Sequence, residues 1–136
     1  MTTSDDVEIP IATGDDVVRV RQATRTAAGA ARLSLVDQTK VVTAASELAR
    51  NTLVYGGGGE ALVSQVTDER GRAGVRIVFR DEGPGIADVD LALTDGWTSG
   101  QGLGLGLTGA RRLVDAFDLE TAVGQGTTIT VTKWRR

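Results

Sequence analysis

The alternation of apolar and polar positions predicts a strand followed by two helices in the first part of the chain. Residues 7–11 alternate as a strand does. Residues 15–33 carry acids in the first turn and arginines along one side, which is typical of a helix packed on a surface. A second helix is expected over residues 34–55, where Ser34 and Asp37 have the spacing of a capping box. The run GGGG that follows is expected to end this helix and turn the chain.

A β-hairpin and a long loop come next. Residues 60–67 and 75–79 are rich in alternating β-forming residues on either side of the turn DERGRAG, so the two runs are expected to pair. The segment GPGIADVDLALTDGWTSGQG holds too many glycines for regular structure, apart from a short helical turn near residues 88–93. A loop of this length in a compact domain usually carries function.

The chain closes with a helix and a second pair of strands. The helix is expected over about 105–117, and strands over 119–123 and 127–133 meet across the turn GQG. The order is strand, helix, helix, strand, strand, helix, strand, strand, which is not the alternation of a βαβ array. We predict a two-layer α/β (α+β) sandwich, with a mixed sheet and helices on one face. At 136 residues it is expected to form a single domain over residues 1–136.

Composition narrows the class of protein without naming it. The chain is 40% hydrophobic and 24% charged, an ordinary globular balance. No apolar run approaches the ~18 residues that would span a bilayer. The start, MTTSDDVEIP, lacks the basic and apolar regions of a secretory signal. We therefore expect a cytoplasmic protein that does not enter a membrane.

Two missing residue types exclude several kinds of chemistry. With 0 histidines and 0 cysteines, the chain offers no zinc cluster, Ser-His-Asp triad, cysteine nucleophile or phosphohistidine of its own. Any metal must favour oxygen ligands, as magnesium does. A net charge of -3, with only two Trp, one Tyr and two Phe, argues against a nucleic-acid surface built from basic patches and stacking rings.

Three segments carry the candidate chemistry. In SELARNTLVYG, Glu47 and Asn51 lie four residues apart and share one face of the second predicted helix. In DEGPGI, Asp81 ends a predicted strand and precedes Gly83 and Gly85. In GQGLGLGLTGARR, glycines stand before a predicted helix, where each costs about 1 kcal/mol relative to alanine. The backbone itself is therefore expected to approach something closely at this point.

Each segment alone has a plain alternative. A Glu-Asn pair at this spacing is usually a solvated helix face, DEGPGI has the composition of a common β-turn, and a glycine run can be merely a flexible loop. Gly104, Gly106 and Gly109 also form G-x-G-x-x-G, as in dinucleotide-binding folds. We set that interpretation aside because the preceding DGWTSGQ is not a predicted strand and no second βαβ half is expected.

Together, the three segments resemble the N, G1 and G2 boxes of the GHKL ATPase superfamily, which gyrase, a class of heat-shock chaperones, histidine kinases and MutL share. The resemblance covers residues 34–136 and is closest to the small anti-sigma-factor-type serine/threonine kinases, among them the stressosome switch kinases. ELARNT, DEGPGI, DGWTSGQGLGLGLTGARRLVD and GQGTTITVTKW carry it in the family's order. It implies the Bergerat-type ATP-binding fold. Thr108, where the family pattern has proline, and the run GGGG depart from that pattern.

The resemblance implies which residues bind ATP. Asp81 would accept a hydrogen bond from the exocyclic amine of adenine, and Thr127 would make a second, often water-mediated contact. Gly83 and Gly85 would let the purine lie against bare backbone. The G2 run would form the hinge of a lid whose amides face the triphosphate, together with the start of the next helix. The residues of this run are Gly102, Leu103, Gly104, Leu105 and Gly106.

Asn51 and Glu47 are expected to divide the remaining chemistry. Asn51, as the N-box asparagine, would ligate Mg²⁺ through its amide oxygen, with phosphates and waters at the other positions. Glu47, one turn earlier, is the candidate general base for a hydroxyl or water aligned on the γ-phosphate. The residues left outside the site are Arg50, Trp97, Arg111 and Arg112.

The implied reaction is phosphate transfer to another protein. A sensor histidine kinase shares the boxes but also needs a histidine, and the chain has 0. The resemblance implies transfer to a serine or threonine of STAS-domain antagonist and scaffold proteins. It also implies that the released kinase activates a PP2C-type phosphatase, within sigma-factor control of the stress response.

Two other functions stay open. One is an ATP-loaded module that sequesters a partner such as a sigma factor with little phosphotransfer, although a pure binder would not need Glu47. The other is an ATPase whose hydrolysis opens a dimer, although we expect no transducer domain in this chain.

Overall fold

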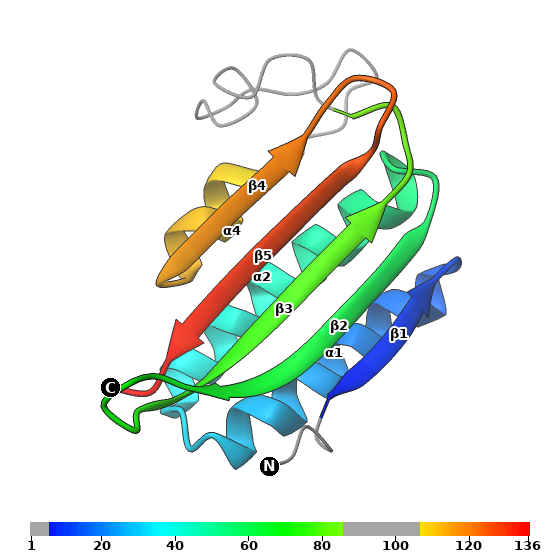
Figure 1. Cartoon of the computed structure of the whole chain (residues 1–136). Helices are drawn as coiled ribbons and strands as arrows, with labels where there is room; N and C mark the ends of the chain where they lie inside the picture. The colour runs from blue at the N-terminus through cyan, green and yellow to red at the C-terminus, as the bar shows by residue number, and fades with distance from the viewer. Residues whose placement is uncertain (1–5, 86–106) are drawn as a thin grey trace.

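The computed structural model describes residues 6–85 and 107–136, which form two layers (Figure 1). One layer is a five-stranded sheet in the order β1-β2-β3-β5-β4, and the helices lie on one face of it. The strands are β1 (Val7–Ile11), β2 (Gly59–Thr67), β3 (Ala73–Asp81), β4 (Ala116–Thr121) and β5 (Thr127–Trp134). The helices are α1 (Gly14–Ala30), α2 (Leu35–Val54) and α4 (Leu107–Leu113). The predicted order of elements and the two-layer α/β architecture are confirmed.

All neighbouring strands of the described sheet run antiparallel, so the expectation of a mixed sheet is wrong. The connections explain the difference. Two successive helices, α1 and α2, join β1 to β2, and because each reverses the chain direction, β2 runs opposite to β1. Among the described residues between β3 and β4, helix α4 precedes β4, and β4 runs in the same direction as β3. Strand β5 lies between these two and pairs antiparallel with both.

Local signals fix both ends of α2 where they were predicted. The Oγ atom of Ser34 accepts a hydrogen bond from the backbone N–H of Asp37 at 3.1 Å and so caps the helix. At the other end, the N–H of Gly58 donates to the carbonyl of Thr52 at 2.8 Å. Gly58 has a φ of 107°, a conformation that favours glycine. The glycine run therefore ends the helix and turns the chain into β2.

Helix α4 ends at Leu113, short of the predicted end at 117, and β4 begins at Ala116 instead of 119. Asp115 explains this correction. Its N–H donates to the carbonyl of Thr132 at 2.9 Å, and its carboxylate accepts the N–H of Trp134 at 2.7 Å. Pairing with β5 therefore starts before the helical sequence pattern has run out.

The hydrophobic core lies between the inner face of the sheet and helices α1 and α2. Alanines on the inner face of α2 let this helix approach the strands closely, and Leu48 fills the space near the ends of β3 and β5. The strands contribute Ile9, Ile11, Ala61, Val63, Val75, Ile77, Phe79, Ile129 and Val131. Among the described helices, none is long and apolar enough to cross a membrane. This packing places the C-terminal half of α2 beside the end of β3 and the start of β5.

Candidate functional site

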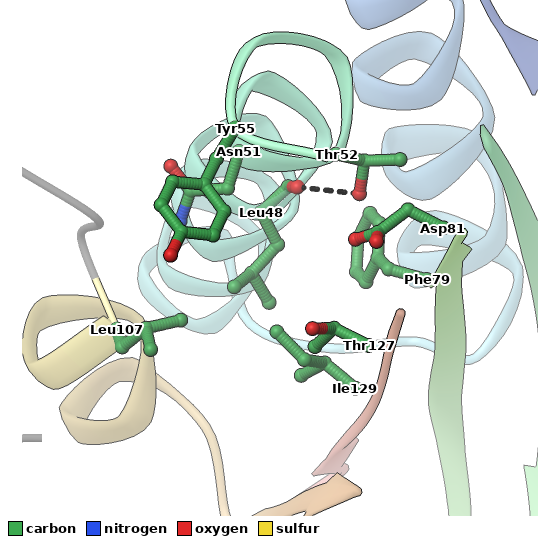
Figure 2. Close-up of a pocket in the computed structure, with 9 residues that line it drawn as sticks. All are labelled: Leu48, Asn51, Thr52, Tyr55, Phe79, Asp81, Leu107, Thr127 and Ile129. Carbon is green, nitrogen blue, oxygen red and sulfur yellow. Dashed lines mark hydrogen bonds between the residues drawn. The ribbon is translucent and has the colours of Figure 1, made fainter. Parts of the chain in front are cut away.

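A pocket lies where α2 meets the end of β3 and the start of β5 (Figure 2). Its apolar wall consists of Leu48, Phe79, Leu107 and Ile129. Its polar groups belong to Asn51, Thr52, Tyr55, Asp81 and Thr127. An apolar cleft with a few convergent polar groups is the usual form of a small-molecule site.

Asp81 is the acidic group of this pocket and the last residue of β3. Its Oδ1 accepts the N–H of Gly83 at 2.9 Å, and the N–H of Thr127 is a second backbone donor. Burial raises the pKa of Asp81 above its ordinary value, and the two backbone hydrogen bonds oppose this rise. Within the described residues, no cation contributes to this shift. The carboxylate therefore keeps acceptor capacity for an N–H of a ligand.

Glycines bring three segments into close contact around Asp81. A Cβ on Gly56 would lie 2.5 Å from Cγ of Asp81, and one on Gly83 would lie 2.8 Å from Cα of Gly56. Gly85 has a φ of 76°, and a Cβ there would lie 2.2 Å from the carbonyl oxygen of Ala122. On that side, Gly83 and Gly85 face protein backbone. Their contact with a purine stays a prediction.

Thr127 lies beside Asp81, with which it is paired in the β3–β5 register. Its Oγ1 is 3.0 Å from Oγ1 of Thr121, and the Thr121 hydroxyl donates to the carbonyl of Gly126 at 3.0 Å. Because a hydroxyl carries one proton, Thr127 donates in its bond with Thr121. The oxygen of Thr127 therefore keeps acceptor capacity, and the structure brings together the two residues expected to contact adenine.

Asn51 carries an unused hydrogen-bonding group. Its Nδ2 atom is buried without a partner among the described residues. Such a buried group costs roughly 1–3 kcal/mol, and it calls for a functional explanation. An amide oxygen is also a suitable magnesium ligand. Since the described part of the chain has no group of three or more acidic side chains that could hold a metal, a magnesium ion at Asn51 would need phosphate and water ligands.

Glu47 lies one helical turn before Asn51 but does not line the same pocket. Its side chain is 41% exposed, and its Oε1 is 3.3 Å from Nη1 of Arg50. It lines instead a groove that residues of α1 and α2 form together. Glu47 therefore lies in this groove, one helical turn from the pocket residue Asn51.

The G2 residues Gly102, Leu103, Gly104, Leu105 and Gly106 lie outside the described residues, as do Trp97 and the helical turn expected near 88–93. The structure describes the residue that follows this run. Leu107 begins α4, is 2% exposed and lines the pocket. The residue that directly follows the glycine run in sequence therefore forms part of the pocket wall.

Thr52 and Tyr55 are pocket residues that the sequence analysis missed. The buried Thr52 donates its hydroxyl to the carbonyl of Leu48 at 2.9 Å, the dashed line in Figure 2. The hydroxyl of Tyr55 donates to the carbonyl of Gly85 at 3.3 Å. Positions 48, 51, 52 and 55 have the i, i+3, i+4, i+7 spacing of one helix face. That spacing is the signal that could have extended the site beyond Glu47 and Asn51.

Two comparisons with known proteins bear on this pocket. Residues 36–136 match the family described as histidine kinase-, DNA gyrase B-, and HSP90-like ATPase. The chain is also 43% identical, over 128 residues, to the serine/threonine-protein kinase RsbT of Bacillus subtilis (strain 168). This match covers 94% of the chain and 96% of that relative. The chain therefore belongs to the histidine kinase-, DNA gyrase B- and HSP90-like ATPase family, in the group of serine/threonine protein kinases that includes its RsbT relative.

Proposed function

We propose that this chain is a cytoplasmic kinase that uses ATP and Mg²⁺ to phosphorylate a serine or threonine of STAS-domain antagonist and scaffold proteins. The observation that carries the proposal is the pairing of two unsatisfied groups in one pocket. Asp81 is an acid without a cationic partner among the described residues, and Nδ2 of Asn51 is buried without a hydrogen-bond partner there. The carboxylate can accept a hydrogen bond from a nucleotide base, and Nδ2 can donate one to a phosphate oxygen.

Each residue has a separate task in binding the nucleotide. Asp81 accepts a hydrogen bond from the exocyclic amine of adenine, and the oxygen of Thr127 accepts a second one directly or through water. Asn51 would supply one oxygen to Mg²⁺, and the ion would supply positive charge to neutralise the phosphates. The run Gly102, Leu103, Gly104, Leu105 and Gly106, which lies outside the described residues, is proposed to bind the triphosphate through its backbone amides.

Glu47 acts as the general base of the transfer. It accepts the proton of the acceptor hydroxyl while the oxygen of that hydroxyl forms a bond to the γ-phosphorus. The bond between the γ-phosphorus and the bridging oxygen breaks, and ADP leaves. The Oε1 atom of Glu47 is 3.3 Å from Nη1 of Arg50, and Asn51 follows Glu47 by one turn of α2.

The proposed role in the cell is that of a partner switch. The kinase is held by the antagonist or scaffold until phosphorylation releases it, and it then binds and activates a PP2C-type phosphatase. The family resemblance and the identity to RsbT support this part of the proposal.

Radiolabelled ATP tests the reaction. The purified chain is incubated with Mg²⁺, labelled ATP and a STAS-domain protein encoded by the same organism, and the labelled product is treated with acid. We expect acid-stable phosphoserine or phosphothreonine on the STAS-domain protein. An acid-labile product would indicate phosphohistidine, and binding without any label would favour the sequestering module.

Two variants in the same assay assign the roles. Glu47→Ala is expected to retain ATP binding but to slow transfer about 100-fold or more, as is typical for a lost general base. Asn51→Ala is expected to abolish magnesium-dependent transfer. Glu69→Ala, at an exposed acid in the β2–β3 turn, is the matched control. A wild-type rate for Glu47→Ala would remove Glu47 from the reaction, and one for Asn51→Ala would remove the metal role of Asn51.

A further inference from the structure

Thr121 is hydrogen-bonded beside the pocket, although it is not among the described residues that line it. It is the last residue of β4 and is paired with Thr127 in the β4–β5 register. Its hydroxyl donates to the carbonyl of Gly126 at 3.0 Å, and its Oγ1 atom is also 3.0 Å from Oγ1 of Thr127. Thr127 is 8% exposed and lines the pocket. Thr121 is therefore connected to the pocket through the hydroxyl of Thr127.

The direction of these two hydrogen bonds fixes the position of the Thr127 proton. A hydroxyl has one proton to donate and two lone pairs that accept. Because the proton of Thr121 is used by the carbonyl of Gly126, the hydroxyl of Thr127 donates to Thr121. A Cβ on Gly126 would lie 2.1 Å from the carbonyl oxygen of Asp81, so the backbone of this turn is closely packed. Thr127 therefore offers a ligand an acceptor and keeps its proton on Thr121.

The neighbouring carboxylate of Asp81 also offers acceptors. It receives the backbone N–H groups of Gly83 and Thr127, and a carboxylate has about four lone-pair sites, so acceptor capacity remains for a ligand. Asp81 and Thr127 are directly paired in the β3–β5 register and line the same pocket (Figure 2). Two adjacent acceptors are complementary to a group with two N–H donors, such as the exocyclic amine of adenine.

We propose that Thr121 is a positioning residue that sets the base specificity of the pocket. By accepting the proton of Thr127, it keeps the Thr127 oxygen as an acceptor for the exocyclic amine of adenine, directly or through one water. The 6-oxo group of hypoxanthine or guanine is itself an acceptor, and neither ionised Asp81 nor Thr127 offers it a side-chain donor. The inference rests on the proposed binding of ATP and adds a residue that distinguishes 6-amino from 6-oxo purines.

Inosine triphosphate is the probe for this role, because it differs from ATP only in the base, which carries a 6-oxo group and a proton on N1. Calorimetry with Mg²⁺ measures the affinities of both nucleotides for the wild type and for Thr121→Val. Valine keeps the branched shape of threonine but leaves the Thr127 hydroxyl able to donate to a ligand. We expect the ratio of the ATP affinity to the inosine triphosphate affinity to fall about 3- to 10-fold, the size of one exchanged hydrogen bond.

Matched variants separate this role from a structural one. Thr121→Ser keeps the hydroxyl and is expected to keep the wild-type ratio. In a Thr127→Val background, Thr121→Val is expected to leave the ratio unchanged, because no Thr127 hydroxyl remains to be oriented. Thr130→Val makes the same chemical change on the face of β5 opposite to the core residues Ile129 and Val131, and it is the control. If Thr121→Val does not fold, Thr121→Ala replaces it with the same expected change in the ratio.

The outcomes separate this inference from the proposed function. ATP binding by the wild type with an unchanged ratio in Thr121→Val would overturn the role of Thr121 and leave the kinase reaction untouched. Equal weakening of both nucleotides, or a lower ratio that persists in the Thr127→Val background, would assign Thr121 to the fold instead. If the folded wild type binds neither nucleotide, both proposals fail. A lower ratio in a protein that transfers no phosphate would support the role of Thr121 while removing the kinase reaction.

Discussion

Buried charges lie near both ends of strand β5, but they are paired at one end only. At its start, Thr127 lies beside Asp81, whose carboxylate has backbone N–H donors but no cationic partner among the described residues. Near its other end, Lys133 is 3% exposed, and its Nζ lies 3.7 Å from Oδ1 of Asp37 and 3.6 Å from Oδ1 of Asp115. One strand thus carries an acid without a cation at one end and a cation between two acids at the other.

The two ends of β5 therefore contribute differently to stability and to ligand binding. The ion cluster around Lys133 joins β5 to the first turn of α2 and to the start of β4, and Asp115 also pairs with Arg136. Because these charges are paired with one another, they hold the elements together and have little capacity left to bind a ligand. Asp81 is partly unsatisfied, which costs stability and leaves a group that can bind. On this view the Lys133 end supports the fold and the Asp81 end supports function.

The largest effect is expected at the structural end. Lys133→Met leaves the buried Asp37 and the partly buried Asp115 without their shared cation, and breaking such a pair typically costs about 3–5 kcal/mol. We expect a loss of unfolding free energy in this range, measured by denaturant titration. The ATP affinity of the folded fraction is expected to stay unchanged.

Lys40→Met, at an exposed lysine of α2, is the matched control and is expected to change stability by less than about 0.5 kcal/mol. A loss of ATP affinity in folded Lys133→Met protein would contradict the assignment of Lys133 to the fold alone. It would mean that the two ends of β5 do not act separately.

The second effect is expected at the functional end. Asp81→Asn removes the charge that strengthens a hydrogen bond from adenine, which is worth about 1.5–3 kcal/mol, or roughly a 10- to 100-fold loss of ATP affinity. The unfolding free energy is expected to stay the same or rise, because burial disfavours the ionised carboxylate. Calorimetry with ATP and Mg²⁺ measures the first quantity, and denaturant titration measures the second.

Glu82→Gln makes the same chemical change at the exposed neighbour and is expected to leave both quantities unchanged. Lower stability of Asp81→Asn with wild-type ATP affinity would assign Asp81 to the fold instead of the ligand.

The same contrast shows what sequence patterns can predict about this fold. Strand β1 and the cap at Ser34 depend on residues close together in the chain, and both were predicted. The early start of β4 depends on Asp115 bonding to Thr132 and Trp134, residues that only the β4–β5 register brings near it. The antiparallel sheet likewise depends on where β5 inserts between β3 and β4. Neither can be predicted from local patterns.

The site shows a similar division. Asp81 and Asn51 were found because they stand in short motifs, and the structure brings both to one pocket. Gly56 was missed, because its need to be glycine comes from its contact with Asp81, which is distant in sequence. Glu47 was found, but spacing alone could not show that it faces a groove of α1 residues and not the pocket itself.

A substitution of Gly56 is expected to have a third and smaller effect, on stability and ATP binding at the Asp81 end of β5. In Gly56→Ala the new Cβ would lie 2.5 Å from Cγ of Asp81, so the carboxylate must move. We expect a loss of stability of about 1–3 kcal/mol, as for other overpacked sites, together with weaker ATP binding. Gly29→Ala, in α1 with no atom within 4 Å of the new Cβ, is the control. It is expected to be neutral or stabilising, and equal effects of the two changes would mean that Asp81 is not held by this contact.

The smallest effect is the pH dependence of stability and ATP affinity, which differs between Asp81 and the acids whose charge is stabilised by hydrogen bonds. Because its pKa is raised, the folded protein holds the proton of Asp81 more tightly than the unfolded chain does. The stability cost of ionising Asp81 is therefore fully present above the folded pKa, decreases as the pH falls through it, and is absent below the unfolded pKa. Asp16 and Asp68 behave in the opposite way, since hydrogen bonds lower their pKa values and their contribution is lost at low pH.

ATP binding should follow the ionised fraction of Asp81. At a pH equal to its folded pKa, half of the carboxylates are protonated, so we expect the wild-type affinity to be about twofold lower than its plateau from this cause. Asp81→Asn lacks this dependence, whereas protonation of the phosphates affects both proteins alike. Calorimetric titrations of both proteins at decreasing pH separate the effect of Asp81 protonation from that of phosphate protonation. A constant ratio of the two ATP affinities at all pH values would show that adenine is not bound by an ionised Asp81.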